Sequence, residues 1–284
     1  MRKEYKIGAK FEKYYFCIES LEDNNEINIE ALERDYGGLH VTAVSISKYF
    51  DIKYSYDQRT WYSWSNNITL NINNKLYFKG NNNDLVIPEP SSGISVAYLF
   101  FTSTKKVAIS GKISTLFNEG ALPLSNKNIS FGFGAGGGGI FINAKPEPDY
   151  DWLKIEDASN FELNIDYLNA PQLFAYISSL KYPPKLPALH TANSGFSHYY
   201  GYEEMFIGCE NLEKLPKLKL VSGNCAEMFS ECTKIKISET KTGIYQNDYY
   251  ISNFTVNNMF TYTGGTFTGT PTNNTTYYTS NEVI

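Results

Sequence analysis

The stretch MFIGCENL at residues 205–212 recurs as MFSECTKI at residues 228–235, and this repeat decides the fold of the C-terminal half. The two Met-Phe pairs lie 23 residues apart (228 − 205), and a degraded third copy follows at Met259-Phe260. A period in the twenties indicates a solenoid, in which units stack because one unit cannot bury its apolar side alone. We expect each unit to supply a short helical turn that carries Met-Phe, followed by an extended Leu-Pro segment.

The four cysteines favour packing over chemistry. Cys209 and Cys232 occupy equivalent positions in the two copies, and no C-x-x-C pair includes them, Cys17 or Cys225. The chain has only three histidines, and the short ligand spacing of a zinc site is absent. We therefore expect buried thiols that act as small apolar side chains, with no metal and no other cofactor.

Upstream of the repeat, short apolar and aromatic runs alternate with polar turns. Strands are predicted at residues 14–18, 40–47, 52–56, 61–64, 68–72 and 75–80. The sequence DQRT at 57–60 suits a hairpin loop between two of them. Strands at this spacing without a convincing helix predict a small, Ig-like β-sandwich over residues 1–90.

A linker is predicted at Pro88-Glu89-Pro90, because Pro-x-Pro resists both helix and central strand. Further strands are expected at 96–101 and 106–113, and the glycine-rich run at 131–139 is predicted to be a loop because it lacks the ending of a phosphate-binding loop.

The predicted fold is mainly β with some short helices: an N-terminal β-sandwich, then a short leucine-rich-repeat-like solenoid over 91–284. From about residue 264 we expect an extended C-terminal tail, either held by a neighbouring molecule or capping the last repeat.

Charge and hydropathy exclude several classes of partner. The formal net charge is −5, from 30 acidic and 25 basic residues, and no basic run is longer than Lys105-Lys106. Nucleic acid is therefore not expected as a ligand. No run approaches the roughly 18 apolar residues of a membrane span. The charged first residues offer no apolar region of a signal peptide, so we expect no export by the general secretory route.

The Met-Phe-x-x-Cys-x-x-Leu units, with Leu-Pro-x-Leu at 186–189 and 215–218, resemble the BspA-type leucine-rich-repeat surface proteins of Bacteroidales and of the phages that infect them, including crAss-like phages. The segment at 54–61 resembles the strand-turn-strand of the β-sandwich that often precedes such repeats, and the segments at 76–81 and 109–113 resemble those that usually follow it. The resemblance covers residues 40 to 284. It implies a non-enzymatic role in adhesion or as a virion appendage, and it supplies no catalytic residues.

Three functions remain in competition. The first is a non-catalytic phage virion structural protein, a tail- or head-associated fibre, spike or decoration subunit that is assembled in the host cytoplasm. It would bind other virion proteins, copies of itself and, in addition, a host-surface glycan or protein. The second is a bacterial cell-surface leucine-rich-repeat adhesin. The third is a glycan-cleaving appendage enzyme, whose carboxylates would be Glu147, Asp149 and Asp151, or the pair Glu203-Glu204.

Exposed aromatic side chains are the candidates for contact with a glycan or a partner subunit. They are Trp61, Tyr62 and Trp64 in the predicted hairpin, and Tyr199, Tyr200 and Tyr202 in an insertion between repeats. Core packing or subunit contact is the favoured interpretation of both groups over glycan binding. The second group interrupts the repeat, so we expect it to project outward and form the better interface.

Overall fold

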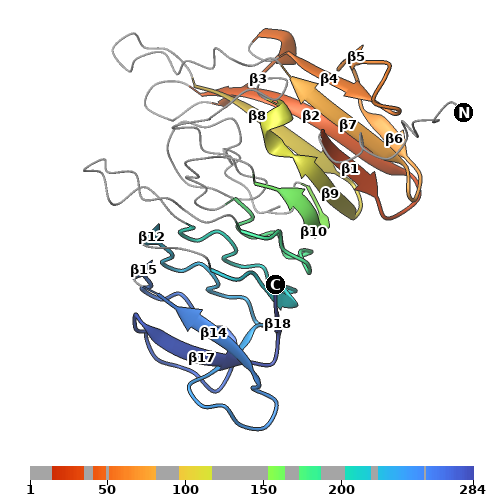
Figure 1. Cartoon of the computed structure of the whole chain (residues 1–284). Helices are drawn as coiled ribbons and strands as arrows, with labels where there is room; N and C mark the ends of the chain where they lie inside the picture. Colours follow the sequence, from red (N-terminus) through yellow and green to blue (C-terminus); the bar gives the residue numbers. More distant parts are fainter. Residues whose placement is uncertain are drawn as a thin grey trace, which may run out of the picture.

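The computed structural model describes residues 15–34, 41–48, 51–80, 96–116, 153–163, 173–186, 202–218, 223–252 and 254–284. These residues are mainly β, as predicted, and the helices described are two short 3-10 segments, η1 (Ile46–Lys48) and η3 (Ile113–Leu116). The predicted linker at 88–90, the glycine-rich run and the carboxylates at 147–151 lie outside the described residues. Figure 1 shows the N-terminal strands above a set of stacked turns, with the C-terminus beside these turns and not at their far end.

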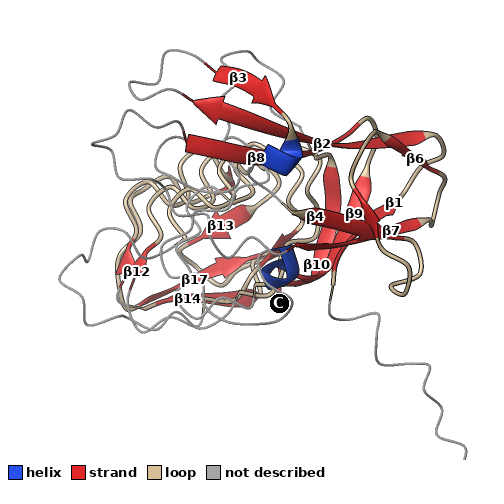
Figure 2. Cartoon of the chain, turned by 90° about the horizontal axis from the view of Figure 1, so that it is seen from above, coloured by secondary structure: helices blue, strands red, loops and turns tan. Residues whose placement is uncertain are grey.

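The N-terminal part consists of two sheets, whose strands are seen from above in Figure 2. The six-stranded sheet has the order β10-β9-β1-β7-β4-β5, and the other sheet has β2 at its centre, paired with β3, β6 and β8. The bounds of these strands are β1 Phe16–Ser20, β2 Asn25–Arg34, β3 Val41–Val44, β4 Ile52–Ser55, β5 Tyr62–Ser63, β6 Ile68–Leu70, β7 Lys75–Gly80, β8 Val96–Ser103, β9 Val107–Lys112 and β10 Ile155–Glu162.

Aromatic side chains join the two sheets. Phe16 of β1 and Phe78 of β7 are completely buried, and their rings lie 5.4 and 5.2 Å from the ring of Phe101 on β8. The alternating residues Ile27 and Ile29 of β2 are buried on the same side. The apolar faces of the two sheets therefore form one shared core.

The domain boundary predicted after residue 90 is wrong. β8 pairs with β2 over eight residues, and β9 pairs with β1. β10 extends the same sheet by parallel pairing with β9. Strands from both sides of the predicted linker are thus interleaved, and the N-terminal sheets continue to residue 162.

Four turn units follow, at residues 173–180, 205–212, 228–235 and 259–266. Phe174, Phe206, Phe229 and Phe260 occupy the same position in each, and their rings stack at 5.5, 5.7 and 6.1 Å between centroids, with interplanar angles of 5°, 2° and 13°. The preceding Met205, Met228 and Met259 are completely buried. The repeat predicted from the two Met-Phe copies is present, and the unit at 173–180 adds a copy that the sequence reading missed (Figure 1).

Backbone hydrogen bonds connect each unit to the next at equivalent atoms. The N–H groups of Phe174, Phe206 and Phe229 donate to the carbonyls of Met205, Met228 and Met259, at 2.9, 3.0 and 3.0 Å. Within a unit, bonds from residue i+3 to residue i follow one another. The expected short helical turn is therefore wrong: successive β-turns with left-handed residues replace it.

The left-handed position after each Phe is filled by Tyr176, Gly208, Glu231 and Tyr262, with φ between 58° and 70°. Gly208 is required in its unit, because a β-carbon there would run into the ring of Tyr176. The side chain of Glu231 is exposed. This residue therefore carries the steric cost of a left-handed backbone in a non-glycine residue.

Replacement of Glu231 by glycine is therefore expected to raise the free energy of unfolding by about 0.5–1 kcal/mol. Glycine adopts positive φ without steric cost, and this gain exceeds the entropy that glycine loses on folding. The matched control is Lys234→Gly, at an exposed residue of the same unit without positive φ, which should lower stability. Urea unfolding followed by circular dichroism measures both, and equal destabilisation by the two variants would contradict the strain argument.

The cysteines behave as expected for packed thiols, since all four are buried and none forms a disulfide. Cys209 Sγ donates to the carbonyl of Phe174 at 3.1 Å, and Cys232 Sγ to that of Phe206 at 3.0 Å. Burial raises the pKa of Cys225 to about 12 and holds the pKa of Cys232 well above its usual range. The thiolate, which is the reactive form, is thus suppressed.

We expect no thiol to react with iodoacetamide in native buffer at pH 8, and all four to react in urea. A thiol of pKa about 12 has roughly one thiolate in ten thousand at that pH, and burial also blocks access. Intact mass spectrometry counts the alkyl groups. A native adduct formed within minutes would contradict the packing described for these side chains.

The C-terminal tail folds back onto the chain, so the expectation of an extended arm is wrong. The remaining strands are β11 Lys214–Leu215, β12 Gly223–Asn224, β13 Lys236–Ser238, β14 Asn247–Ile251, β15 Phe254–Thr255, β16 Gly264–Gly265, β17 Thr275–Thr279 and β18 Glu282–Val283. β17 lies between β13 and β14, and β18 pairs with β11. The rings of Phe267 and Tyr277 pack edge-on to Phe260, where the stack ends. Capping, the second alternative for the tail, is thus the one observed.

The two parts share one core. Phe161 of β10 lies 6.0 Å from Phe16 and 6.3 Å from Phe174 of the first turn unit. Glu156 of β10 binds Lys106 at 2.6 Å and Lys181 at 3.4 Å, and the bond from Lys106 is the main cause that lowers the pKa of Glu156. A continuous aromatic column and these ion pairs therefore join the sheets to the turn units.

Candidate functional site

The predicted hairpin is present and carries an aromatic cluster. β4 and β5 pair antiparallel with Tyr54 opposite Tyr62, at the edge of the six-stranded sheet (Figure 1). The ring of Tyr54 lies 5.5 Å from those of Tyr62 and Trp64, and 5.8 Å from that of Tyr56. Tyr56 is 54% exposed and Tyr62 is 47% exposed. The hairpin therefore presents a tyrosine surface to solvent.

The turn behind this surface is held by one carboxylate. Asp57 Oδ1 accepts hydrogen bonds from the N–H groups of Thr60 and Arg59, both at 2.8 Å, and from the Ser55 hydroxyl at 2.9 Å. These bonds lower the pKa of Asp57 to about 2, and the bond from the Thr60 N–H has the largest effect. The charged, bonded form therefore persists as the pH falls toward 2, and the turn fixes the position of Tyr56 next to it.

The other hairpin candidates are partly packed. Trp61 lies edge-on to Tyr15 at 4.8 Å, with Lys79 Nζ 4.5 Å from its ring. Trp64 packs against the buried Phe78 at 6.0 Å. Both tryptophans are half-buried, so Tyr62 is the most accessible of the three predicted residues.

The outward projection expected of the second group is wrong for Tyr202, which is completely buried. Its backbone N–H donates to the Asn224 carbonyl of the next unit at 2.7 Å, and burial raises the pKa of its phenol strongly. Tyr202 thus belongs to the stack and forms no surface. Tyr199 and Tyr200 lie outside the described residues.

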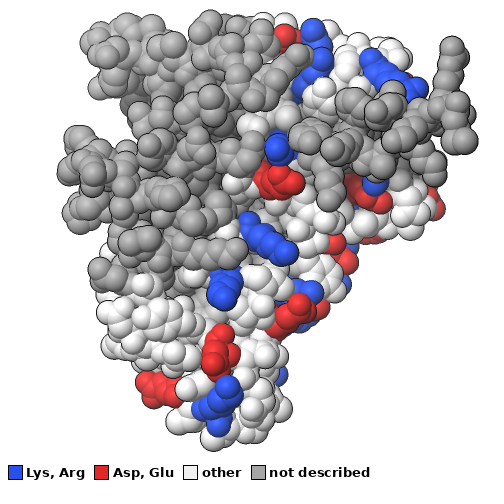
Figure 3. All heavy atoms as spheres, in the orientation of Figure 1, with Lys and Arg blue, Asp and Glu red and all other residues white. Residues whose placement is uncertain are grey.

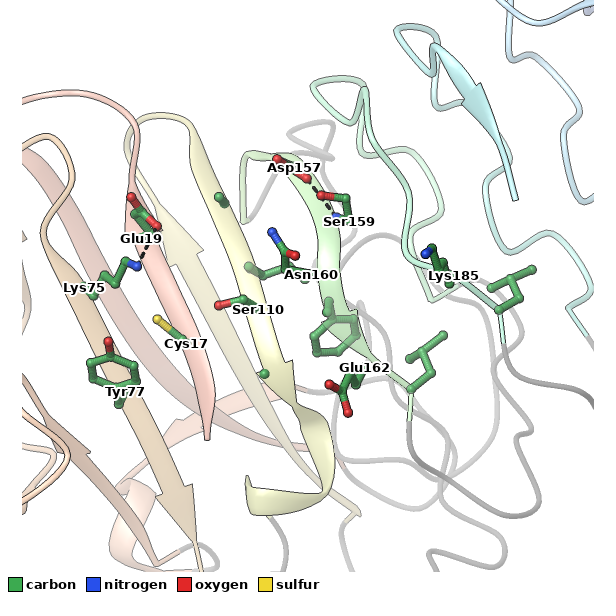
Figure 4. Close-up of a pocket in the computed structure, with 16 residues that line it drawn as sticks. Cys17, Glu19, Lys75, Tyr77, Ser110, Asp157, Ser159, Asn160, Glu162 and Lys185 are labelled. Carbon is green, nitrogen blue, oxygen red and sulfur yellow. Dashed lines mark hydrogen bonds and ion pairs between the residues drawn. The ribbon is translucent and has the colours of Figure 1, made fainter. Parts of the chain in front are cut away.

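A groove of about 580 Å³ crosses β7, β1, β9 and β10 and reaches the segment after the first turn unit (Figure 4). Glu19 and Lys75 form an ion pair at 3.4 Å at one end, and Lys185 stands exposed at the other. Between them lie small polar side chains, Ser110 and Asn160 among them. The sequence reading missed this groove because each strand contributes only a few residues to it.

The acidic groups of this groove are already engaged. Asp157 Oδ1 accepts the N–H of Ser159 at 2.8 Å, Glu19 is paired with Lys75, and Glu162 lies 3.9 Å from Lys112. The alternative pair Glu203-Glu204 immediately precedes the second turn unit, and Glu204 donates its backbone N–H to the Ala226 carbonyl. The carboxylates of Asp157, Glu19 and Glu162 are therefore bonded to groups of the chain itself.

Three further observations bear on ligands. Among the described residues, no three His, Cys, Asp or Glu side chains gather as a metal site would require. No helix in that part of the chain is long and apolar enough to cross a membrane. On the face shown in Figure 3, the basic and acidic side chains of the described residues are interspersed and do not form a patch of one sign. Comparison of the chain with protein-family models, with curated proteins and with solved structures finds no match to any of them.

Proposed function

We propose that this chain is a non-catalytic structural protein of a phage particle, a tail- or head-associated fibre, spike or decoration subunit. In this proposal the two N-terminal sheets are a β-sandwich, and the turn units are a short leucine-rich-repeat solenoid of the BspA type. Its partners are other virion proteins and copies of itself, with a host-surface ligand as an additional one.

The main support for the proposal is that the residues of the repeated motif pack into the core. Its aromatic rings stack, its methionines are buried, and its thiols donate to backbone carbonyls of the preceding unit. The motif residues with reactive side chains thus serve packing. A continuous core of this kind makes a rigid scaffold, which suits a protein that works by assembly and contact.

The tyrosine surface of the hairpin favours a second candidate, a bacterial cell-surface adhesin. Tyr56 and Tyr62 offer large, half-apolar contact area at fixed positions, as binding surfaces commonly do. A binding surface of this kind serves an adhesin as well as a virion appendage, so the location of the protein decides between them.

The test is peptide mass spectrometry and immunogold microscopy on purified phage particles and on the envelope fraction of the producing cells. Peptides of this chain at constant stoichiometry in particles, with label at one discrete position, are the expected result. Label on the envelope with none on particles would replace the virion proposal by the adhesin. A glycan-cleaving activity of the purified chain would overturn the non-catalytic part of the proposal.

A further inference from the structure

A second groove, of about 530 Å³, opens beside the hairpin. One wall comes from β2 and the segment around η1, and the other from the end of β5 and the loop that follows it. Its polar lining side chains are Asn28, Ser45, Ser47, Ser65, Asn66 and Asn67. The volume lies within the roughly 300–1,000 Å³ typical of small-ligand sites.

The apolar lining consists of Ile29, Ile46 and the ring of Trp64. Trp64 also contacts Tyr54, and Tyr54 contacts Tyr62 and Tyr56. The aromatic surface of the hairpin is therefore continuous with the groove. A ligand seated against Trp64 can extend along the exposed tyrosines.

The loop residues of the groove are free to bind. The side chains of Ser65, Asn66 and Asn67 are exposed and make no hydrogen bond or ion pair with the described part of the chain. By contrast, Asn28 is fixed by bonds to Glu30 and to the Ile29 N–H, and Ser45 bonds to Ser47. One wall of the groove is thus held by hydrogen bonds within the chain. The other wall presents the amides of Asn66 and Asn67 and the hydroxyl of Ser65, which are available to bond to a ligand.

We infer that this groove binds a neutral saccharide. An amide and a hydroxyl each donate and accept hydrogen bonds, as sugar hydroxyls do. The apolar C–H face of a pyranose ring packs on an indole or phenol ring. None of the described lining residues is charged, so a sulfated or sialylated sugar would lose its hydration without a compensating cation. The inference rests on the proposed function, for which it names the class of surface ligand.

Binding is tested by NMR with the full chain and defined probes: maltohexaose, cellohexaose, laminarihexaose and a linear mannohexaose, with heparin hexasaccharide as the acidic probe. The chain has three tryptophans, and Trp64→Phe assigns the indole N–H signal of Trp64. The expected result is a saturable shift of that signal with at least one neutral probe. No saturable shift with any neutral probe at millimolar concentration, or equal binding of heparin hexasaccharide at Trp64, would overturn the inference.

The double variant Asn66→Ala/Asn67→Ala is expected to bind the neutral probe about tenfold more weakly or worse, because it removes the unused amides. Both side chains are exposed and unbonded within the described residues, so its melting temperature should equal that of the wild type. The matched control is Asn257→Ala, at an exposed asparagine just before the fourth unit. Unchanged affinity of the double variant would contradict the groove as the site. Failure here leaves the location on the particle, which is measured separately, unaffected.

Discussion

Replacement of Phe206 by alanine is expected to lower the free energy of unfolding by about 3–5 kcal/mol, the range for a large aromatic side chain removed from a core. Its ring is completely buried and stacks on Phe174 at 5.5 Å and on Phe229 at 5.7 Å. The variant loses both contacts at once and leaves a cavity in the middle of the column. Neighbouring units cannot close it, because their spacing is set by the backbone hydrogen bonds between them.

Urea unfolding, with the midpoint and slope fitted separately, measures this loss. Tyr262→Ala is the matched control: this side chain is also aromatic and also in a turn unit, but it is 75% exposed. We expect the control to lie within about 0.5 kcal/mol of the wild type. A loss below about 1 kcal/mol for Phe206→Ala would show that the stack contributes little to stability.

Gly111→Ala is expected to cost about 4 kcal/mol or more, which is exceptional for the addition of one methyl group. Gly111 lies in β9 one residue beyond the last pair with β1, at φ 76°, and a β-carbon there would run into the backbone carbonyl of Tyr15. A backbone atom of a central strand cannot swing aside as a side chain can, so β1 and β9 would have to separate locally. We expect a large loss of the folded state in the same urea titration.

The matched control for this prediction is Gly243→Ala. Gly243 also has positive φ, 56°, but nothing lies within 4 Å of a β-carbon built on it. The Gly243→Ala variant is therefore expected to lose only the free energy of the backbone strain, about 1–2 kcal/mol. The difference between the two variants isolates the steric clash at Gly111, and equal losses would refute it.

The repeated units were predictable to the extent that they kept the same residue types. Met-Phe-x-x-Cys marks the units at 205 and 228. The unit at 173 has Leu173-Phe174, Ile177 and Leu180 at the same spacing, all completely or almost completely buried. The fold constrains size and apolarity at these positions, so a search by residue identity misses this copy, and a search by apolar spacing would find it.

The strand pairing was less predictable than the strands. The segments 52–56, 61–64 and 75–80 were found, because their turn residues and alternation are local signals. β10 was missed: register shifts interrupt its pairing with β9, so its buried residues Ile155, Ala158 and Phe161 do not alternate. The partners of β8, β9 and β10 lie far upstream, and no local signal in the sequence specifies them.

The candidate sites divide in the same way. The hairpin aromatics were found from the sequence because strand, turn and strand are contiguous. The neutral groove draws its walls from residues 28–29, 45–47 and 64–67, which approach one another only after the two sheets have formed. Tyr202 was misplaced because the insertion that precedes it suggested a loop, whereas this residue belongs to the stack.

The position of β1 has a consequence for the order in which the chain folds. Cys17 of β1 pairs with Tyr77 on one side and with Ser110 on the other, so the first strand to leave the ribosome must wait for the seventh and the ninth. Contacts this distant along the chain slow folding. The last three turn units contact neighbours that are much nearer in sequence. When the complete chain refolds, we therefore expect the last three turn units to become ordered first, with β1 exposed and prone to aggregation until it pairs with β7 and β9.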